Sequence, residues 1–153
     1  SAHMNIENSL DNKDYEKALE IATQLANNGD AKGQHILGTL YFEGTGVKQD
    51  YEQAFLWLRR AASHGMPLAK VHLARSYIQG LGVQQDIGEA YKLIKQAADS
   101  GLPIAKWALK TAYFERDGNE LKVNKEKTIK RMKESAKEGV TEAQFYVGLH
   151  YEN

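Results

Sequence analysis

The sequence repeats itself every 36 residues, and this repeat constrains the fold more than any other feature. A shift of 36 positions brings eleven residues of the first copy, among others, onto identical residues, and both prolines coincide in this way. In the first copy these residues are Leu37, Tyr41, Gly44, Gly46, Val47, Asp50, Ala54, Ala61, Ala62, Gly65 and Pro67. A repeat of this length is typical of an array of stacked supersecondary units, because one unit alone cannot bury its apolar face.

The register continues on both sides of the two clear copies. Upstream, residues 14–29 match residues 50–65. Downstream, a two-residue insertion between Phe114 and Gly118 lengthens the step to 38 residues. We therefore expect one continuous solenoid domain, in which residues 1–4 are a remnant of cloning, 5–30 a capping helix at the N-terminus, 31–66, 67–102 and 103–140 three repeats, and 141–153 the first helix of a fourth repeat.

Each repeat reads as a hairpin of two helices. Apolar residues at helical spacing, such as Leu37, Leu40 and Tyr41, predict the first helix (helix A), and Gly44 and Gly46 then end it. We expect helix A at residues 31–43, 67–79, 103–116 and 141–152. No segment alternates apolar and polar residues with a period of two, so we expect no β-strand. The predicted fold class is all-α, an α/α solenoid.

The second helix of each repeat (helix B) has a clear start and a clear end. Asp50 with Gln53, and Asp86 with Glu89, have the spacing of a capping box at the start of a helix. Alanines dominate the apolar stripe of helix B and allow the helices to approach closely. Gly65 follows the helix where a left-handed residue is favoured, and the proline two positions later fits the first turn of the next helix.

Composition and motifs argue against several functions. Twenty basic residues balance twenty acidic ones, and there is no cysteine. No apolar run approaches the roughly 20 residues of a membrane span. The five histidines lack the spacing of a helical metal site, and the Gly-x-Gly pairs lack the ending of a phosphate-binding loop. We therefore expect no enzyme activity, no catalytic or metal-binding residue, no cofactor, no nucleic-acid partner and no membrane insertion.

One face of helix A is more apolar than a solvated surface should be. Helix A packs on helix B through the face centred on Leu37, Leu73 and Leu109, and in an array of hairpins the opposite face lines the concave surface. Exposed apolar and aromatic side chains usually mark an interaction site. The expected contact residues are His35, Phe42, Val71, Arg75, Ile78, Trp107, Thr111, Phe114, Phe145 and Leu149. Packing within the superhelix is the alternative interpretation of the same positions.

Residues 69–101 resemble a SEL-one-like repeat, a longer relative of the tetratricopeptide repeat. Residues 37–65 are similar and carry Trp57 at the family's tryptophan position. The resemblance covers residues 14 to 151, and it implies a right-handed α/α superhelix. It also implies a role as an adaptor, regulator or assembly factor, mostly in bacteria.

The third repeat departs from the family's pattern. Lys110 replaces a small residue, Glu120 the second loop glycine, and Arg131 the tryptophan or leucine of helix B. Residues 104–140 carry ten basic and six acidic side chains, so this segment has a local charge of +4. The glutamates interspersed among the lysines favour a solvated outer face over a site for an anionic partner.

Three functions remain open at this stage. The leading hypothesis is a scaffold or adaptor that binds a protein or peptide on the concave face. The alternatives are an immunity or inhibitor protein that neutralises a bacterial toxin or effector, and a structural module at the end of a longer array. The last helix is apolar nearly all round, which predicts a weak homodimer or a partner contact there. The sequence does not distinguish the cytoplasm from the periplasm.

Overall fold

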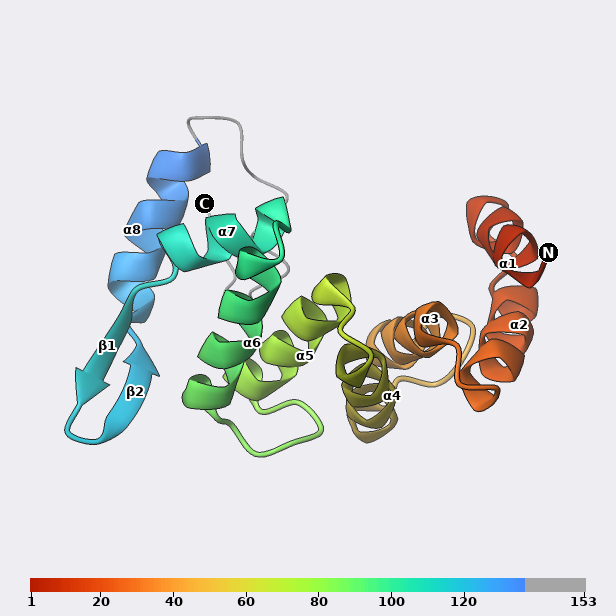
Figure 1. The fold of residues 1–153 in the computed structure, drawn as a ribbon, viewed down its shortest axis with the longest axis horizontal. Helices are drawn as coiled ribbons and strands as arrows, with labels where there is room; N and C mark the ends of the chain where they lie inside the picture. Colours follow the sequence, from red (N-terminus) through yellow and green to blue (C-terminus); the bar gives the residue numbers. More distant parts are fainter. Residues whose placement is uncertain (137–153) are drawn as a thin grey trace. The chain divides into compact units, whose positions relative to one another are not determined.

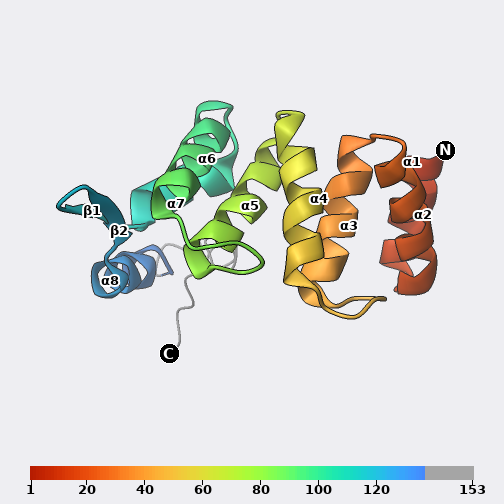
Figure 2. The same cartoon turned by 90° about the horizontal axis from the view of Figure 1, so that it is seen from below.

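The computed structural model describes residues 1–136, and residues 137–153 lie outside this description. The described residues form eight helices and one two-stranded antiparallel sheet (Figure 1, Figure 2). In chain order these are α1 (Ala2–Asp11), α2 (Tyr15–Asn27), α3 (Ala31–Glu43), α4 (Tyr51–Ser63), α5 (Pro67–Gln79), α6 (Ile87–Asp99), α7 (Pro103–Thr111), β1 (Phe114–Asp117), β2 (Glu120–Val123) and α8 (Lys125–Ala136). The chain forms two compact units, one of residues 1–69 and one that begins at Lys70.

The predicted bounds of helix A are confirmed in two repeats, because α3 spans Ala31–Glu43 and α5 spans Pro67–Gln79. The N-terminal region differs from the prediction. Residues 5–30 hold most of α1 and all of α2, where we expected one helix. The assignment of residues 1–4 to a remnant of cloning stays a prediction. The break falls at Lys13, which has a left-handed φ of 58°, and the Asp14 carboxylate then accepts the N–H of Lys17 at 3.3 Å to start α2.

Aspartate side chains start both helices B of the first two repeats, as predicted. The Asp50 carboxylate accepts the N–H groups of Glu52 and Gln53, both at 3.1 Å. The Asp86 carboxylate accepts the N–H of Glu89 at 3.0 Å. These bonds satisfy N–H groups that have no partner inside the helix, which stabilises each helix start by about 1 kcal/mol.

The loop between helix A and helix B is held by two further bonds. The N–H of Asp50 donates to the carbonyl of Tyr41 at 2.9 Å, and the side-chain amide of Gln49 donates to the carbonyl of Phe42 at 2.9 Å. The second repeat reproduces both bonds at the positions 36 residues further on. The end of helix A is therefore tied to the start of helix B, and this is why the loop sequence repeats along with the helices.

Small residues set the packing of the first unit. Gly33 and Gly38 show how closely its helices approach one another. A Cβ at Gly33 would lie 2.4 Å from the Cβ of Leu25 in α2, and a Cβ at Gly38 would lie 2.9 Å from the Cγ of Leu58 in α4. The buried core around them consists of Ile6, Ala18, Ala22, Ala26, Leu37 and Leu40.

The third repeat does not follow the prediction. We expected helix A over residues 103–116, but α7 ends at Thr111, and Ala112 has an extended backbone with φ −65° and ψ 123°. Two strands follow, so the expectation that the chain has no β-strand is also wrong. Phe114, which we had placed on helix A, lies on β1.

Two adjacent residues, Gly118 and Asn119, explain this hairpin. They form a two-residue connection between the paired residues Asp117 and Glu120, and Gly118 has a φ of 66°. Glycine adopts this angle without strain, and Gly-Asn between two short runs is a hairpin signal. Glu115, Arg116 and Asp117, which precede the turn, are exposed and would give the end of a longer α7 no apolar surface to bury.

Candidate functional site

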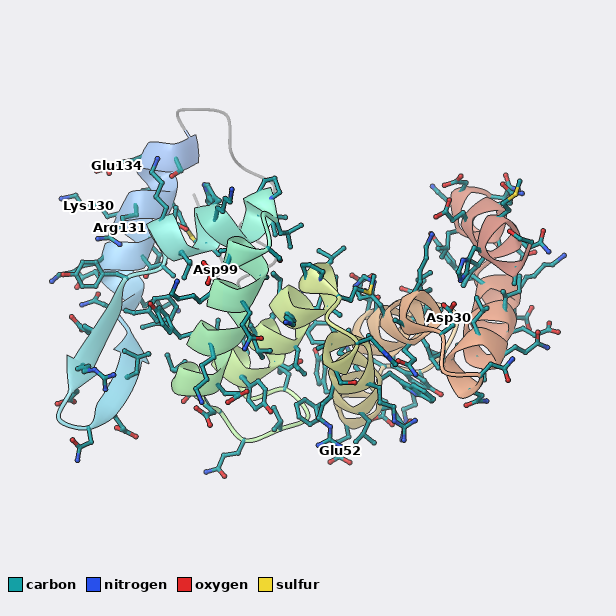
Figure 3. The ribbon with its side chains drawn as sticks, viewed as in Figure 1. Asp30, Glu52, Asp99, Lys130, Arg131 and Glu134 are labelled. Carbon is teal, nitrogen blue, oxygen red and sulfur yellow. The ribbon has the colours of Figure 1, made fainter. Side chains whose placement is uncertain are left out.

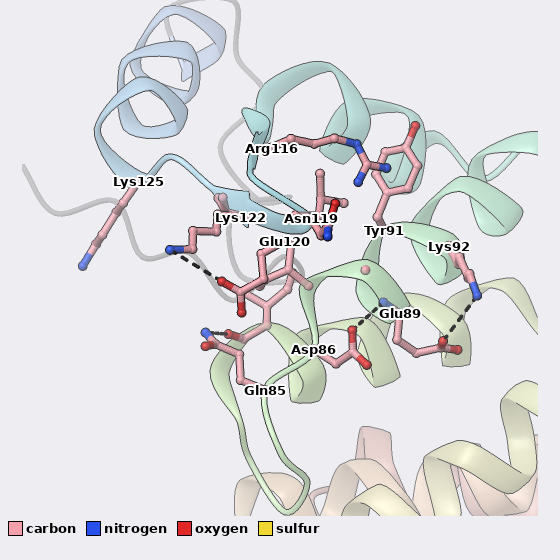
Figure 4. A pocket seen from close by; sticks show the side chains of 15 residues that line it. Gln85, Asp86, Glu89, Tyr91, Lys92, Arg116, Asn119, Glu120, Lys122 and Lys125 are labelled. Atoms are coloured by element: carbon pink, nitrogen blue, oxygen red, sulfur yellow. Dashed lines mark hydrogen bonds and ion pairs between the residues drawn. The ribbon is translucent and has the colours of Figure 1, made fainter.

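A groove lies beside the hairpin in the second unit (Figure 4). The hairpin forms one wall, and the start of α6 with Gln85 and Asp86 forms the other. Ile78 of α5 and Lys125 of α8 complete the lining. The groove is half open, and its volume of about 990 Å³ is near the upper end of the roughly 300–1,000 Å³ of ligand pockets.

The hairpin is amphipathic because paired residues of its two strands share a face. Phe114 pairs with Val123, and Arg116 pairs with Leu121. These four side chains lie on one face, where the three apolar ones are half-buried. The ring of Phe114 packs edge-on against the ring of Tyr91 in α6, with centroids 5.0 Å apart. This aromatic contact holds the hairpin against α6.

The opposite face of the hairpin is charged and exposed. Lys122 forms ion pairs with Asp117 at 3.1 Å and with Glu120 at 3.8 Å. The hydrogen bond that Lys122 donates to the Asp117 carboxylate raises the pKa of Lys122 above its ordinary value. Exposed pairs of this kind add little stability, so the apolar face of the hairpin determines its position.

Apolar side chains form much of the groove lining. Ile78 is buried at the end of α5, and the side-chain amide of Gln85 donates to its carbonyl at 2.9 Å. Tyr91 contributes from α6, and Leu121 and Val123 contribute from β2. The lining thus combines the fixed end of one helix with the half-buried face of the hairpin.

Charged side chains surround this apolar lining, and most of them are already paired. They are Asp86, Glu89, Lys92, Arg116, Glu120, Lys122 and Lys125. All three carboxylates and two of the four basic groups take part in hydrogen bonds or ion pairs within the chain (Figure 4). Arg116 and Lys125 are exposed and have no such partner among residues 1–136. The groove therefore presents two uncompensated positive charges beside an apolar surface.

Eight of the ten residues predicted for the concave face lie in the described part of the chain. Five of these are buried, with exposed fractions from 0% to 9%, namely His35, Phe42, Val71, Ile78 and Thr111. Arg75, Trp107 and Phe114 are half-buried. Phe145 and Leu149 lie outside the described residues. Use of this face for binding stays a prediction, and its half-buried members are those that offer surface to a partner.

Burial determines what His35 and Phe42 of the predicted concave face can contribute to binding. Desolvation lowers the pKa of His35 from 6.5 to about 4, so the imidazole is neutral at pH 7 and offers no charge to an anionic partner. The ring of Phe42 packs edge-on against Tyr51, with centroids 5.1 Å apart. Both side chains serve packing in this structure, in agreement with the alternative interpretation of the face.

The basic helix α8 uses part of its charge within the chain. The guanidinium of Arg131 and the ammonium of Lys127 lie 4.5 Å and 4.6 Å from the centroid of the Tyr113 ring. Lys130 and Glu134, both exposed, project from the same helix (Figure 3). Mixed charges on an exposed helix surface are typical of a solvated outer face.

Sequence reasoning missed the groove because it missed the hairpin. The Gly118–Asn119 pair was the available signal, and the short alternation at Leu121 and Val123 supported it. With the hairpin in place, Arg116 and Tyr91 would have been candidates as well. Periodicity over such short runs does not reveal this on its own.

The chemistry of the groove suits binding. Among residues 1–136, no group of three or more histidine, aspartate or glutamate side chains is placed to hold a metal ion. In the same part of the chain, no helix has both the length and the apolar character needed to cross a membrane. The groove offers apolar surface, the backbone of a strand and two basic side chains, Arg116 and Lys125, that have no acidic partner among residues 1–136.

Comparison with known proteins places the chain in a family. The sequence model of the Sel1 repeat matches residues 11–30, 31–66, 67–102 and 141–153, which is more than half of the chain. Residues 103–140, which include the hairpin, lie between the matched segments. A comparison with curated proteins gives no significant match.

Two solved structures are similar to the chain. The crystal structure of a Sel1 repeat protein from Oxalobacter formigenes is 30% identical, with a TM-score of 0.64, over 90% of this chain and 39% of that one. A protective antigen present in uropathogenic Escherichia coli strains, which displays an SLR fold, is 28% identical, with a TM-score of 0.60, over 87% of this chain and 28% of that one. The chain thus spans well under half of the length of either protein.

The α/α solenoid class predicted from the 36-residue step is confirmed by these relatives and by the helical hairpins. Sel1 repeat proteins generally mediate interactions between proteins. The repeat-to-repeat identities, the family match and the fold agree, and the chain belongs to the Sel1 repeat family.

Proposed function

We propose that the chain is a non-enzymatic scaffold that binds a segment of another protein in the hairpin groove. The observation that carries this proposal is a half-open groove that combines an apolar lining with two unpaired basic groups. Binding sites usually have this form, in which apolar surface supplies affinity and a few polar groups supply orientation. The general role of Sel1 repeat proteins as interaction scaffolds supports it.

Of the three functions considered, the adaptor requires such a binding step, whereas a structural module at the end of a longer array does not depend on it. The proposal concerns that step, and we favour the adaptor because a groove of this kind fits a short segment. An immunity protein would instead engage a folded toxin over a broad surface, and no described residue singles out that role.

We include the accessible part of the predicted concave face as a secondary contact area. Arg75 and Trp107 are its half-buried helical members. A guanidinium matches the geometry of a carboxylate, and tryptophan is frequent among binding hot spots. Trp107→Ala is expected to weaken partner binding by about 2 kcal/mol or more and to leave the Tm nearly unchanged. A large fall in the Tm would show that Trp107 serves packing.

A peptide-display selection tests the groove itself. Random linear peptides would be selected on the whole chain, and the Kd of each enriched peptide would be measured by calorimetry. We expect Tyr91→Ala to raise the Kd about tenfold or more, because it removes an aromatic side chain from the groove lining. Tyr15→Ala, which truncates a half-buried tyrosine of the first unit, serves as the matched control and should leave the Kd unchanged.

Thermal unfolding of both tyrosine variants would verify that each remains folded. If the selection enriches no peptide, or if both variants bind every enriched peptide as the parent chain does, the groove is not the binding surface. Binding that only Trp107→Ala weakens would transfer the role to the secondary contact area.

A further inference from the structure

The outer edge of β2 carries backbone groups that the hairpin itself does not use. The N–H of Asn124 donates to the carbonyl of Tyr113 at 2.8 Å, so these two residues form a hydrogen-bonded pair at the end of the ladder. Bonded and non-bonded pairs alternate along an antiparallel ladder. Leu121 and Val123 therefore belong to non-bonded pairs, and their N–H and C=O groups point away from β1.

This edge faces the groove. All four residues of β2 line the groove, whereas Arg116 is the member of β1 that does so. Side chains alternate between the two faces of a strand, so a groove that is lined by side chains from both faces runs along the edge of that strand. The outward N–H and C=O groups of Leu121 and Val123 thus point toward the groove. Among residues 1–136, no hydrogen bond occupies them.

The charged side chains around the groove determine which sign of charge an occupant should carry. Arg116 shares a face of the hairpin with the apolar side chains of the lining, and Lys125 begins α8. Neither has an acidic partner in the described chain, while every carboxylate of the groove already has a hydrogen-bond or ion-pair partner. An added carboxylate would therefore be bound without the loss of an existing pair, and the lining carries four basic groups against three carboxylates.

We propose, on the basis of the function proposed above, that the groove binds an extended, acidic and apolar segment of a partner protein as a third strand on β2. The backbone of the segment pairs with Leu121 and Val123. A carboxylate of the segment pairs with Arg116, and its apolar side chains cover Tyr91. Strand addition of this kind takes affinity from main-chain bonds and specificity from side-chain pockets.

Charge also distinguishes a partner from a second copy of this chain. Two hairpins paired through their β2 edges would each bring their own Arg116, and the carboxylates of each hairpin, which are Glu115, Asp117 and Glu120, already have partners. A segment of a different protein can supply the missing negative charge. The structure therefore favours a heterologous occupant.

Two matched display libraries test the charge of the occupant. In both, residues with high strand propensity alternate with charged residues, which are Asp or Glu in one library and Lys or Arg at the same positions in the other. We expect enrichment from the acidic library and not from the basic one. Arg116→Glu should raise the Kd of the enriched acidic peptides about tenfold or more, as charge-assisted bonds contribute. Lys106→Glu, an equal change of charge at an exposed site of α7 outside the groove, should leave that Kd within about threefold, the effect of a distant surface charge.

A backbone test separates strand addition from other ways of filling the groove. Leu121→Pro removes one outward N–H, and an edge position with an outward N–H is where a strand tolerates proline. Leu121→Ala removes the side chain and keeps the N–H, so it is the matched control. We expect the proline variant to bind the acidic peptides several-fold more weakly than the alanine variant. If the proline variant does not fold, N-methylation of single peptide residues replaces it, and every second position should be sensitive.

The outcomes separate this inference from the proposed function. Peptides that need Tyr91 but tolerate Arg116→Glu, or that accept N-methylation at every position, would overturn strand addition of an acidic segment and leave the groove as a binding site. Enrichment from the basic library would do the same. Failure to obtain any peptide that depends on Tyr91 would overturn both. Self-association that Arg116→Glu abolishes in light scattering would assign the edge to a second copy and refute the heterologous partner.

Discussion

Replacement of Gly33 by alanine tests the close approach of α2 and α3. Gly33 lies in the first turn of α3, and a Cβ built there would be 2.4 Å from the Cβ of Leu25. It would also lie 3.0 Å from the backbone nitrogen of Ala26 and 3.1 Å from the carbonyl carbon of Leu25. Two of the three obstructing atoms belong to the backbone, so rotation of a side chain does not relieve the contact.

The magnitude follows from two opposed effects. Alanine is up to about 1 kcal/mol more favourable than glycine within a helix. Against this, carbon atoms pack at about 3.5–4.0 Å, so α2 and α3 must separate by roughly 1 Å, which sacrifices a quarter to a half of the dispersion at each contact. Overpacking that moves the backbone costs about 3 kcal/mol. The expected net loss for Gly33→Ala is therefore about 2 kcal/mol.

Gly88 provides the matched control, because it also lies in the first turn of a helix, α6. A Cβ at Gly88 would meet one atom, the Oδ1 of Asp86, at 3.4 Å, which is ordinary contact. Gly88→Ala should therefore leave stability unchanged or raise it by up to about 1 kcal/mol. The same substitution is thus expected to have opposite signs at two positions.

Urea unfolding followed by far-UV circular dichroism would measure both variants. A loss of about 2 kcal/mol corresponds to a fall in the Tm of about 4–8 °C for a chain of this size. The reasoning is refuted if Gly33→Ala is as stable as the parent chain, because the helices would then yield at a position where the structure shows no room.

Three further predictions concern other buried positions. Leu73 is 4% exposed, and its replacement by alanine should lower the free energy of unfolding by about 2–5 kcal/mol. A decrease below about 1 kcal/mol in urea unfolding would show that Leu73 does not lie in the core. Ser76→Ala should be neutral or stabilising by about 1 kcal/mol, because its buried hydroxyl has no hydrogen-bond partner among residues 1–136. Ser9→Ala, which removes a 2.9 Å bond to a carbonyl, should instead destabilise in the same assay. The folded-state pKa of His35, about 4, lies below the unfolded value of 6.5. Its contribution to the free energy of unfolding is therefore complete above pH 6.5, and up to about 3 kcal/mol of it is lost as the pH falls towards 4. His35→Gln should flatten this part of the stability–pH profile, and the exposed His64→Gln should not.

The predictable parts of the fold are those whose residues recur at the repeat interval. Leu37 and Leu73 recur because each fills the same position of a hairpin, and their exposed fractions are 1% and 4%. Asp50 and Asp86 recur because a helix start needs an acceptor for its free N–H groups. Identity at a fixed interval reveals such positions without any knowledge of the partners they contact.

The contact face was less predictable, for a geometric reason. Helical periodicity identifies the side of helix A that faces away from helix B, and His35, Val71 and Thr111 occupy that side. It contains no information about what else packs there, and these three side chains are buried. A hairpin of two four-residue strands is equally hard to foresee, since alternation over so few residues also occurs by chance.

The departures of the third repeat from the family pattern form one connected set. Lys110 occupies the position of Gly38, where a Cβ would meet the side chain of Leu58 at 2.9 Å, yet Lys110 is exposed because α7 ends one residue later. Arg131 replaces an apolar residue of helix B, stacks on Tyr113 and donates to the carbonyl of Lys110 at 3.5 Å.

The loop of this repeat completes the set. Gly118 lies 38 residues after Gly80, which is the step that follows the two-residue insertion. Its φ is similar, 66° against 67°, so the left-handed position of the loop is kept while the chain around it pairs as a hairpin. Glu120, at the place assigned to the second loop glycine, closes that hairpin opposite Asp117. Each departure that weakens the repeat thus supports the hairpin or the short α7. The repeat that fits the family pattern least is therefore the one that builds a groove, and a binding surface specific to this chain is expected where the constraints of the repeat are relaxed.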